Sequence, residues 1–127
     1  MGCRTSVVTL RNPLKAENLD AVHNSAISVK VSIEVGVSYL DFGPKLRQFA
    51  TEVTLAKETG ADSKAFEKYE EALRIYKSNY LLWGTMLNVN GHAAGMGKLF
   101  AQGEAGLQQG WVSAAAAIEE ATKLHER

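Results

Sequence analysis

Residues 27–39 read ISVKVSIEVGVSY, and the fold depends on whether they form a strand or a helix. Apolar residues occupy every second position of this stretch, and most of them are β-branched. Such alternation is typical of a strand with one face buried. Taken alone, the stretch predicts a strand at 27–39 and therefore an α+β fold.

The sequence around this stretch favours a helix instead. Residues 16–26, AENLDAVHNSA, have a helical composition and carry no turn signal before Ile27. At helical spacing, the polar and the apolar side chains of the stretch fall on separate stripes. A strand would also need a partner, and the obvious candidate is only the short run SVVTL at 6–10. We therefore predict a helix from about residue 14 to 42 and keep the strand as the alternative.

Two more helices are predicted downstream, at 44–59 and 63–88. The first follows a break at 41–44 and ends at Gly60, which is suited to a helix C-terminus. The second carries a largely aromatic seam whose members are alternately three and four residues apart: Phe66, Tyr69, Leu73, Tyr76, Tyr80, Trp83 and Leu87. Because the loop at 60–62 is short, the two helices are expected to form an antiparallel hairpin.

Residues 88–110 contain six of the eleven glycines and interrupt this pattern. We predict a flexible glycine-rich connection at 88–106, with one turn of helix around 98–102, and a last helix from about 105 to 126. The expected fold is all-α: a three- or four-helix bundle in a single domain at 13–127. Residues 1–12 are expected to form an extended leader.

Composition excludes several classes of partner. Lys and Arg together number 14, as do Asp and Glu, so the formal net charge is zero and nothing favours a nucleic-acid partner. No run of about 18 apolar residues suggests a membrane span. The single cysteine rules out an internal disulfide.

Motifs for catalysis or cofactor binding are missing. The stretch from Gly91 to Lys98 ends in Gly-Lys, but its spacing is one residue too long for a phosphate loop, and Leu99 replaces the magnesium-binding Ser or Thr. No Gly-x-Ser-x-Gly elbow occurs. The histidines lie in different segments without metal-ligand spacing: His23, His92 and His125. We therefore predict a protein that is not an enzyme and holds no metal or cofactor.

The last part of the aromatic seam is the predicted partner-binding surface. Helical spacing favours a core role for the seam as a whole, because such a stripe has to be buried. Tyrosine and tryptophan also dominate binding hot spots. We expect a protein partner where the seam meets the glycine-rich segment, at Tyr80, Trp83 and Leu87.

The opening residues MGCRTS bear on location. Gly2-Cys3 matches the closing pair of a bacterial lipobox, in which the cysteine becomes the lipidated first residue of the mature chain. Met1-Gly2 with Ser6 also matches the N-myristoylation pattern, with Cys3 as a neighbouring palmitoylation site. A third interpretation is an accidental Met-Gly, or a cloning remnant, followed by a simple surface thiol.

Gly2-Cys3, the extended leader and the helical domain behind it together resemble small bacterial lipoproteins. The resemblance covers residues 2–12 and the general architecture, and it names no activity. It implies a signal peptide before Cys3, a lipid on Cys3, and a membrane-anchored protein of the cell envelope that faces the periplasm or the exterior. A cytoplasmic location is the alternative.

The expected function is therefore that of a membrane-tethered helical module that binds a protein partner or serves a structural role. Two alternatives stay open. One is a soluble bundle that binds a small ligand or a metal in its core, using the histidines with the tyrosines. The other is a homo-oligomer whose subunits meet at the alternating segment and at a row of small residues: Ser28, Ser32 and Gly36.

Overall fold

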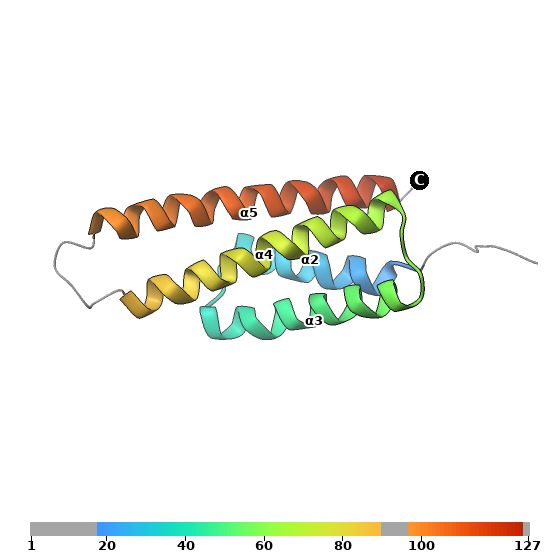
Figure 1. Cartoon of the computed structure of the whole chain (residues 1–127), viewed down its shortest axis with the longest axis horizontal. Helices are drawn as coiled ribbons and strands as arrows, with labels where there is room; N and C mark the ends of the chain where they lie inside the picture. Colours follow the sequence, from blue (N-terminus) through green and yellow to red (C-terminus); the bar gives the residue numbers. More distant parts are fainter. Residues whose placement is uncertain (1–17, 90–96, 126–127) are drawn as a thin grey trace, which may run out of the picture.

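The computed structural model describes residues 18–89 and 97–125, and these form an all-α bundle (Figure 1). Its helices are α2 (Asp20–Val35), α3 (Tyr39–Glu58), α4 (Lys64–Val89) and α5 (Gly97–His125). Each helix runs antiparallel to the next along the chain, and α5 packs back against α2. The described residues contain no strand. The predicted all-α bundle is confirmed, with four helices in the part of the chain that the structure describes.

The alternating stretch is helical as far as Val35, so the strand alternative at 27–39 is wrong. Val29 of this stretch is buried in the core, as are Val22 and Ala26 just before it. Val31 and Val35 are 43% and 80% exposed. Residues two apart in a helix point to nearly opposite sides, so alternation makes this helix apolar on two faces.

The break between the first two helices comes earlier than the predicted 41–44. Helix α2 ends at Val35, and its C-cap is Gly36, whose φ of 105° favours glycine. The Ser38 hydroxyl then caps α3 by accepting a hydrogen bond from the Asp41 backbone N–H at 3.1 Å. Asp41 and Pro44 therefore lie inside the first turns of α3. The Ser38 cap was not predicted, because Gly43-Pro44 is the stronger helix-breaking signal in this part of the sequence.

Helices α3 and α4 form the predicted antiparallel hairpin. The turn between them contains Gly60 with φ 94°, and the Ser63 hydroxyl accepts a hydrogen bond from the Phe66 backbone N–H at 3.1 Å. The first half of the aromatic seam is buried as a core stripe: Phe66, Tyr69, Leu73 and Tyr76. Burial of these large side chains is the main stabilising contribution of the hairpin.

The flexible connection predicted at 88–106 is wrong wherever the structure describes that segment. Helix α4 continues to Val89 and α5 already begins at Gly97, while residues 90–96 lie outside the described chain. Figure 1 shows α4 and α5 running side by side beyond the ends of α2 and α3. The leader at 1–12 also lies outside the described residues.

Close packing explains why glycines are used within this helix pair. A Cβ on Gly103 would lie 2.8 Å from the Met86 sulfur, and a Cβ on Gly110 would overlap the Asn79 amide. Asn79 is buried and donates a hydrogen bond to the Leu107 carbonyl at 2.9 Å. Small residues continue along the same face of α5 toward its C-terminus: Ala114, Ala117 and Ala121, all buried. These glycines let α4 and α5 approach each other.

None of the described helices combines the length and the apolar character that crossing a membrane requires.

Candidate binding site at the α2–α3 turn

Two cavities adjoin the turn at 36–38 and share Gly36 and Val37. The larger, here called the turn groove, has a volume of about 730 Å³. The smaller, here called the tryptophan pocket, has a volume of about 390 Å³. Both fall within the roughly 300–1,000 Å³ that is usual for ligand sites.

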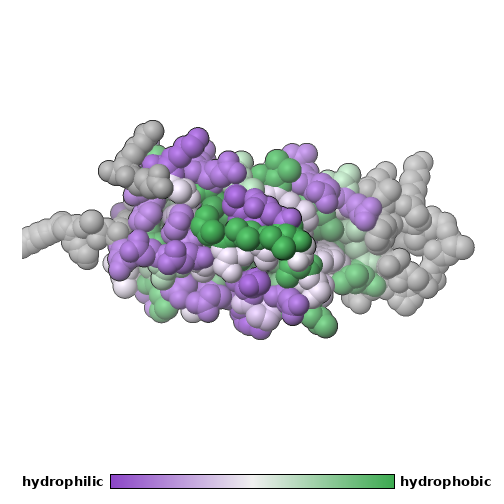
Figure 2. Space-filling model, turned by 180° about the vertical axis from the view of Figure 1, so that it is seen from behind, coloured by the Kyte–Doolittle hydropathy of each residue, from purple (hydrophilic) through white to green (hydrophobic). Residues whose placement is uncertain are grey.

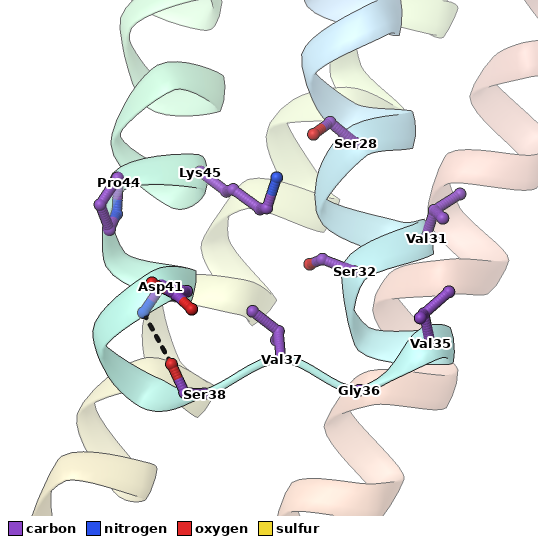
Figure 3. Close-up of a pocket in the computed structure, with 10 residues that line it drawn as sticks. All are labelled: Ser28, Val31, Ser32, Val35, Gly36, Val37, Ser38, Asp41, Pro44 and Lys45. Carbon is purple, nitrogen blue, oxygen red and sulfur yellow. Dashed lines mark hydrogen bonds between the residues drawn. The ribbon is translucent and has the colours of Figure 1, made fainter.

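The turn groove lies between the C-terminal half of α2 and the start of α3 (Figure 3). The hydroxyls of Ser28 and Ser32 point from α2 toward α3, and Lys45 points from α3 toward α2. Ser32 already donates a hydrogen bond to the Val29 carbonyl at 2.7 Å. Within the described part of the chain, Lys45 forms no ion pair, so its ammonium group can bind a partner at this groove.

An apolar stripe borders the turn groove on α2. It consists of Ile27, Val31 and Val35, which are four residues apart and therefore share one helix face. Figure 2 shows that apolar surface, in green, is present among hydrophilic side chains, in purple, on the face of the bundle turned away from the viewer in Figure 1. Leu40, just past the turn, is 83% exposed. Apolar surface gathered in this way marks interaction sites more often than scattered single residues do.

The tryptophan pocket lies on the other side of the turn, between α2, α4 and α5. Trp83 and Trp111 form two of its walls, with ring centroids 6.0 Å apart and ring planes at 80°. Glu34 also lines it; that side chain is 54% exposed and pairs with Lys30 at 2.8 Å. Burial, and then the negative charge of Glu34, raises the pKa of Tyr76 well above its ordinary value.

The three residues predicted to face a partner have different environments. Tyr80 is half-buried and stacks on Tyr39, with ring centroids 4.7 Å apart and planes at 9°. Trp83 is half-buried in the tryptophan pocket, and Leu87 is 47% exposed. Tyr80 therefore packs between helices, and Trp83 is the member of the three that lines a described cavity.

Sequence reasoning named the alternating segment only as a subunit contact in the homo-oligomer alternative, and it did not name Val31, Val35 or Glu34 individually as site residues. Their signal was present in the alternation itself, because alternating apolar residues on a helix leave a second apolar face. Trp111, in the predicted last helix, was not named as a site residue either. Its contact with Trp83 depends on the close packing of α4 and α5. The sequence did not indicate this packing, because the glycines of 88–110 were interpreted as a flexible connection.

Two of the three histidines do converge in space. The Nδ1 atom of His23 lies 2.7 Å from the Tyr69 hydroxyl, and the His23 and His125 rings stack at 5.9 Å. His125 Nε2 in turn lies 3.4 Å from Asp20 Oδ1. These contacts join the start of α2 to the end of α5. His92 lies outside the described residues, and within them no three or more His, Cys, Asp or Glu side chains are grouped so as to hold a metal ion.

The chemistry available around the α2–α3 turn is that of binding. It offers an apolar stripe, aromatic walls, an ammonium group and a carboxylate on helices, which suits recognition of another molecule.

Cys3 lies outside the described residues. Comparison with protein-family models, with curated proteins and with solved structures finds no significant match for this chain.

Proposed function

We propose that this chain is a non-enzymatic binding module of the bacterial cell envelope. A lipid on Cys3 holds it at the membrane, and the leader at 1–12 separates the bundle from the lipid surface. The bundle binds a protein partner through the apolar stripe on α2 and the adjoining turn groove.

The observation that carries the binding proposal is the exposure of Val31 and Val35 beside a groove of about 730 Å³. Both valines lie on a helix whose opposite face already supplies core residues. Helix α2 thus exposes the Val31 and Val35 end of its apolar stripe, whereas Ile27 is partly buried against the core. Burial of the exposed end against a partner would stabilise a complex by roughly 25 cal/mol for each Å² removed from water.

The fitting partner is an amphipathic helix. Its apolar face would pack on Val31 and Val35 as residues spaced three and four apart do in helix-in-groove recognition. Its polar flank would need a carboxylate for Lys45 and a cationic group for Asp41, which lie one turn apart on α3. This mixed requirement gives the interaction a preferred orientation.

The Gly2-Cys3 pair supports the envelope part of the proposal, and intact mass tests it. The chain is expressed from its own gene with the upstream sequence kept, and cells are fractionated. We expect a diacylglycerol-sized mass increment and membrane partitioning, both lost in a Cys3→Ala variant. An unmodified chain that stays out of the membrane fraction would remove the anchor from the proposal without touching the groove.

Partner binding is tested with charge substitutions on the stripe. Val31→Glu and Val35→Glu should abolish co-purification of a partner from solubilised membranes, because a carboxylate would have to be buried against an apolar face. Leu55→Glu is the matched control, since Leu55 is 51% exposed on α3 and lies outside the turn groove. The partner is identified by mass spectrometry and its binding is repeated with purified protein.

Two results would overturn the groove assignment. One is equal co-purification with all three variants. The other is a concentration-dependent doubling of mass in solution that only the stripe variants lose, which would give the stripe to a second copy of the chain, as in the homo-oligomer alternative.

A further inference from the structure

We propose that the tryptophan pocket binds an ammonium cation that carries a short apolar stem. This site is separate from the partner surface proposed above, because the pocket opens on the other side of the α2–α3 turn. Its ligand class also differs from an amphipathic helix.

The aromatic walls provide the first reason. Trp83 and Trp111 stand at 80° to each other with centroids 6.0 Å apart, so they form a corner of two indole rings. A cation within about 6 Å of an indole centroid is attracted by the negative face of the ring, and tryptophan is the strongest partner of this kind. Phe42 packs against both indoles, with its ring centroid 5.8 Å from that of Trp83 and 5.5 Å from that of Trp111.

The electrostatics of the lining give the sign of the ligand. Glu34 lines the pocket, whereas its ion-pair partner Lys30 does not. The Lys30–Glu34 pair is largely exposed on the glutamate side, so it costs little to share that carboxylate with a second cation. Burial, and after it the negative charge of Glu34, raises the pKa of the nearby Tyr76.

The remaining walls accept an apolar stem. Ile33, Val37 and Leu107 also line the pocket, and Gln108 adds an amide to its lining. A volume of about 390 Å³ suits a small ligand. The pocket thus combines aromatic faces and one carboxylate for a cationic head with aliphatic walls for its substituent.

Tryptophan fluorescence tests the proposal directly, because the chain contains two tryptophans and both line the pocket. The full-length protein is titrated with butyltrimethylammonium. The controls are 3,3-dimethylbutan-1-ol, which has an uncharged head of similar shape, and butylsulfonate, which is an anion. We expect a saturable change in emission with the cation, and binding about tenfold weaker or absent with both controls.

The role of the carboxylate is tested with Glu34→Gln, which keeps the shape of the side chain. It should weaken binding of the cation about fivefold or more while the melting temperature stays close to that of the unaltered chain. Glu58→Gln is the control, because Glu58 lies at the far end of α3 outside the pocket. Lys30→Ala should strengthen binding, since it leaves Glu34 to the ligand alone.

A second titration identifies the source of the ammonium group. Saturation by Nα-acetyl-lysine methylamide would assign the cation to a lysine side chain, and saturation by butyltrimethylammonium alone to a small quaternary ammonium compound. The proposal is overturned if the uncharged alcohol binds as well as the cation, if no probe saturates, or if Glu34→Gln binds the cation unchanged.

Discussion

Tyr39 and Tyr80 hold α3 and α4 together through a reciprocal contact with two glycines. Their rings stack with centroids 4.7 Å apart and planes at 9°. The Tyr39 hydroxyl lies over Gly84 on α4, and the Tyr80 hydroxyl lies over Gly43 on α3. Each tyrosine therefore fills the space that the glycine of the other helix leaves open.

Gly84→Ala tests this contact. A Cβ there would lie 2.5 Å from the Tyr39 hydroxyl, so overpacking should outweigh the roughly 1 kcal/mol that alanine gains over glycine in a helix. We expect the free energy of unfolding to fall by about 1–2 kcal/mol in urea titrations. In the Tyr39→Phe background the nearest remaining atom is Cζ at 3.2 Å, and most of that loss should disappear. An equal loss in both backgrounds would show that the tyrosine hydroxyl is not the cause.

Tyr76 should make stability fall at high pH. Burial raises its pKa, so above about pH 10 the unfolded chain releases this proton while the folded chain keeps it. The unfolded state then binds fewer protons, and the free energy of unfolding declines with pH by up to about 1.4 kcal/mol per unit. We expect the stability of the unaltered chain relative to Tyr76→Phe to be constant from pH 7 to 9 and to decline above 10. A relative stability that stays constant to pH 11 would contradict this prediction.

Individual side chains were predictable where spacing alone determines burial. The seam residues Tyr69 and Tyr76 were predicted to be core and are buried. Tyr80 belongs to the same seam, but its stacking on Tyr39 depends on where α3 begins. The Ser38 cap sets that start at Tyr39, whereas the Gly43-Pro44 pair led to a predicted start at residue 44.

Helix α5 illustrates how glycine has two opposite meanings in a sequence. Gly103, Gly106 and Gly110 suggested flexibility, yet they lie within a continuous helix. Their spacing of three and four continues into the buried alanines of the same helix, which is the pattern of a face that another helix approaches closely. Counting glycines predicts a loop, and only their periodicity identifies the helix.

Two glycine substitutions on this element should have opposite effects. Gly110→Ala would overlap Asn79 and break its hydrogen bond to Leu107, so we expect it to lower the free energy of unfolding by about 2 kcal/mol or more. Gly106→Ala is the matched control. Its Cβ would lie 3.6 Å from Leu82, an ordinary contact, and we expect a gain of about 0.5–1 kcal/mol. Thermal unfolding followed by circular dichroism checks both, and equal effects would contradict close packing of α4 on α5.

Helix α2 shows why the alternating stretch was ambiguous. Alternation fits a strand with one buried face, and it fits equally a helix whose second face serves another purpose. The choice between strand and helix depends on which other elements of the chain each could pack against. Three long helices offer α2 a core to pack against, whereas the described chain offers a strand no neighbour.

At the scale of the bundle, the four helices of the described residues place both cavities at one turn. The hairpin of α3 and α4 was predictable from periodicity and a short loop. The arrangement of α2 beside α5, which completes the tryptophan pocket, was not, because it depends on packing between the ends of the chain. The candidate site therefore emerged from the fold more than from any motif.

Site-specific photo-crosslinking at position 35 tests the proposed binding surface most directly. A photoreactive residue replaces Val35, or Leu55 as the control, in cells that express the chain from its own gene. We expect a covalent adduct with one partner protein in the membrane fraction at position 35 and none at position 55. Absence of an adduct at position 35, or the same adducts at both positions, would contradict a partner surface on α2.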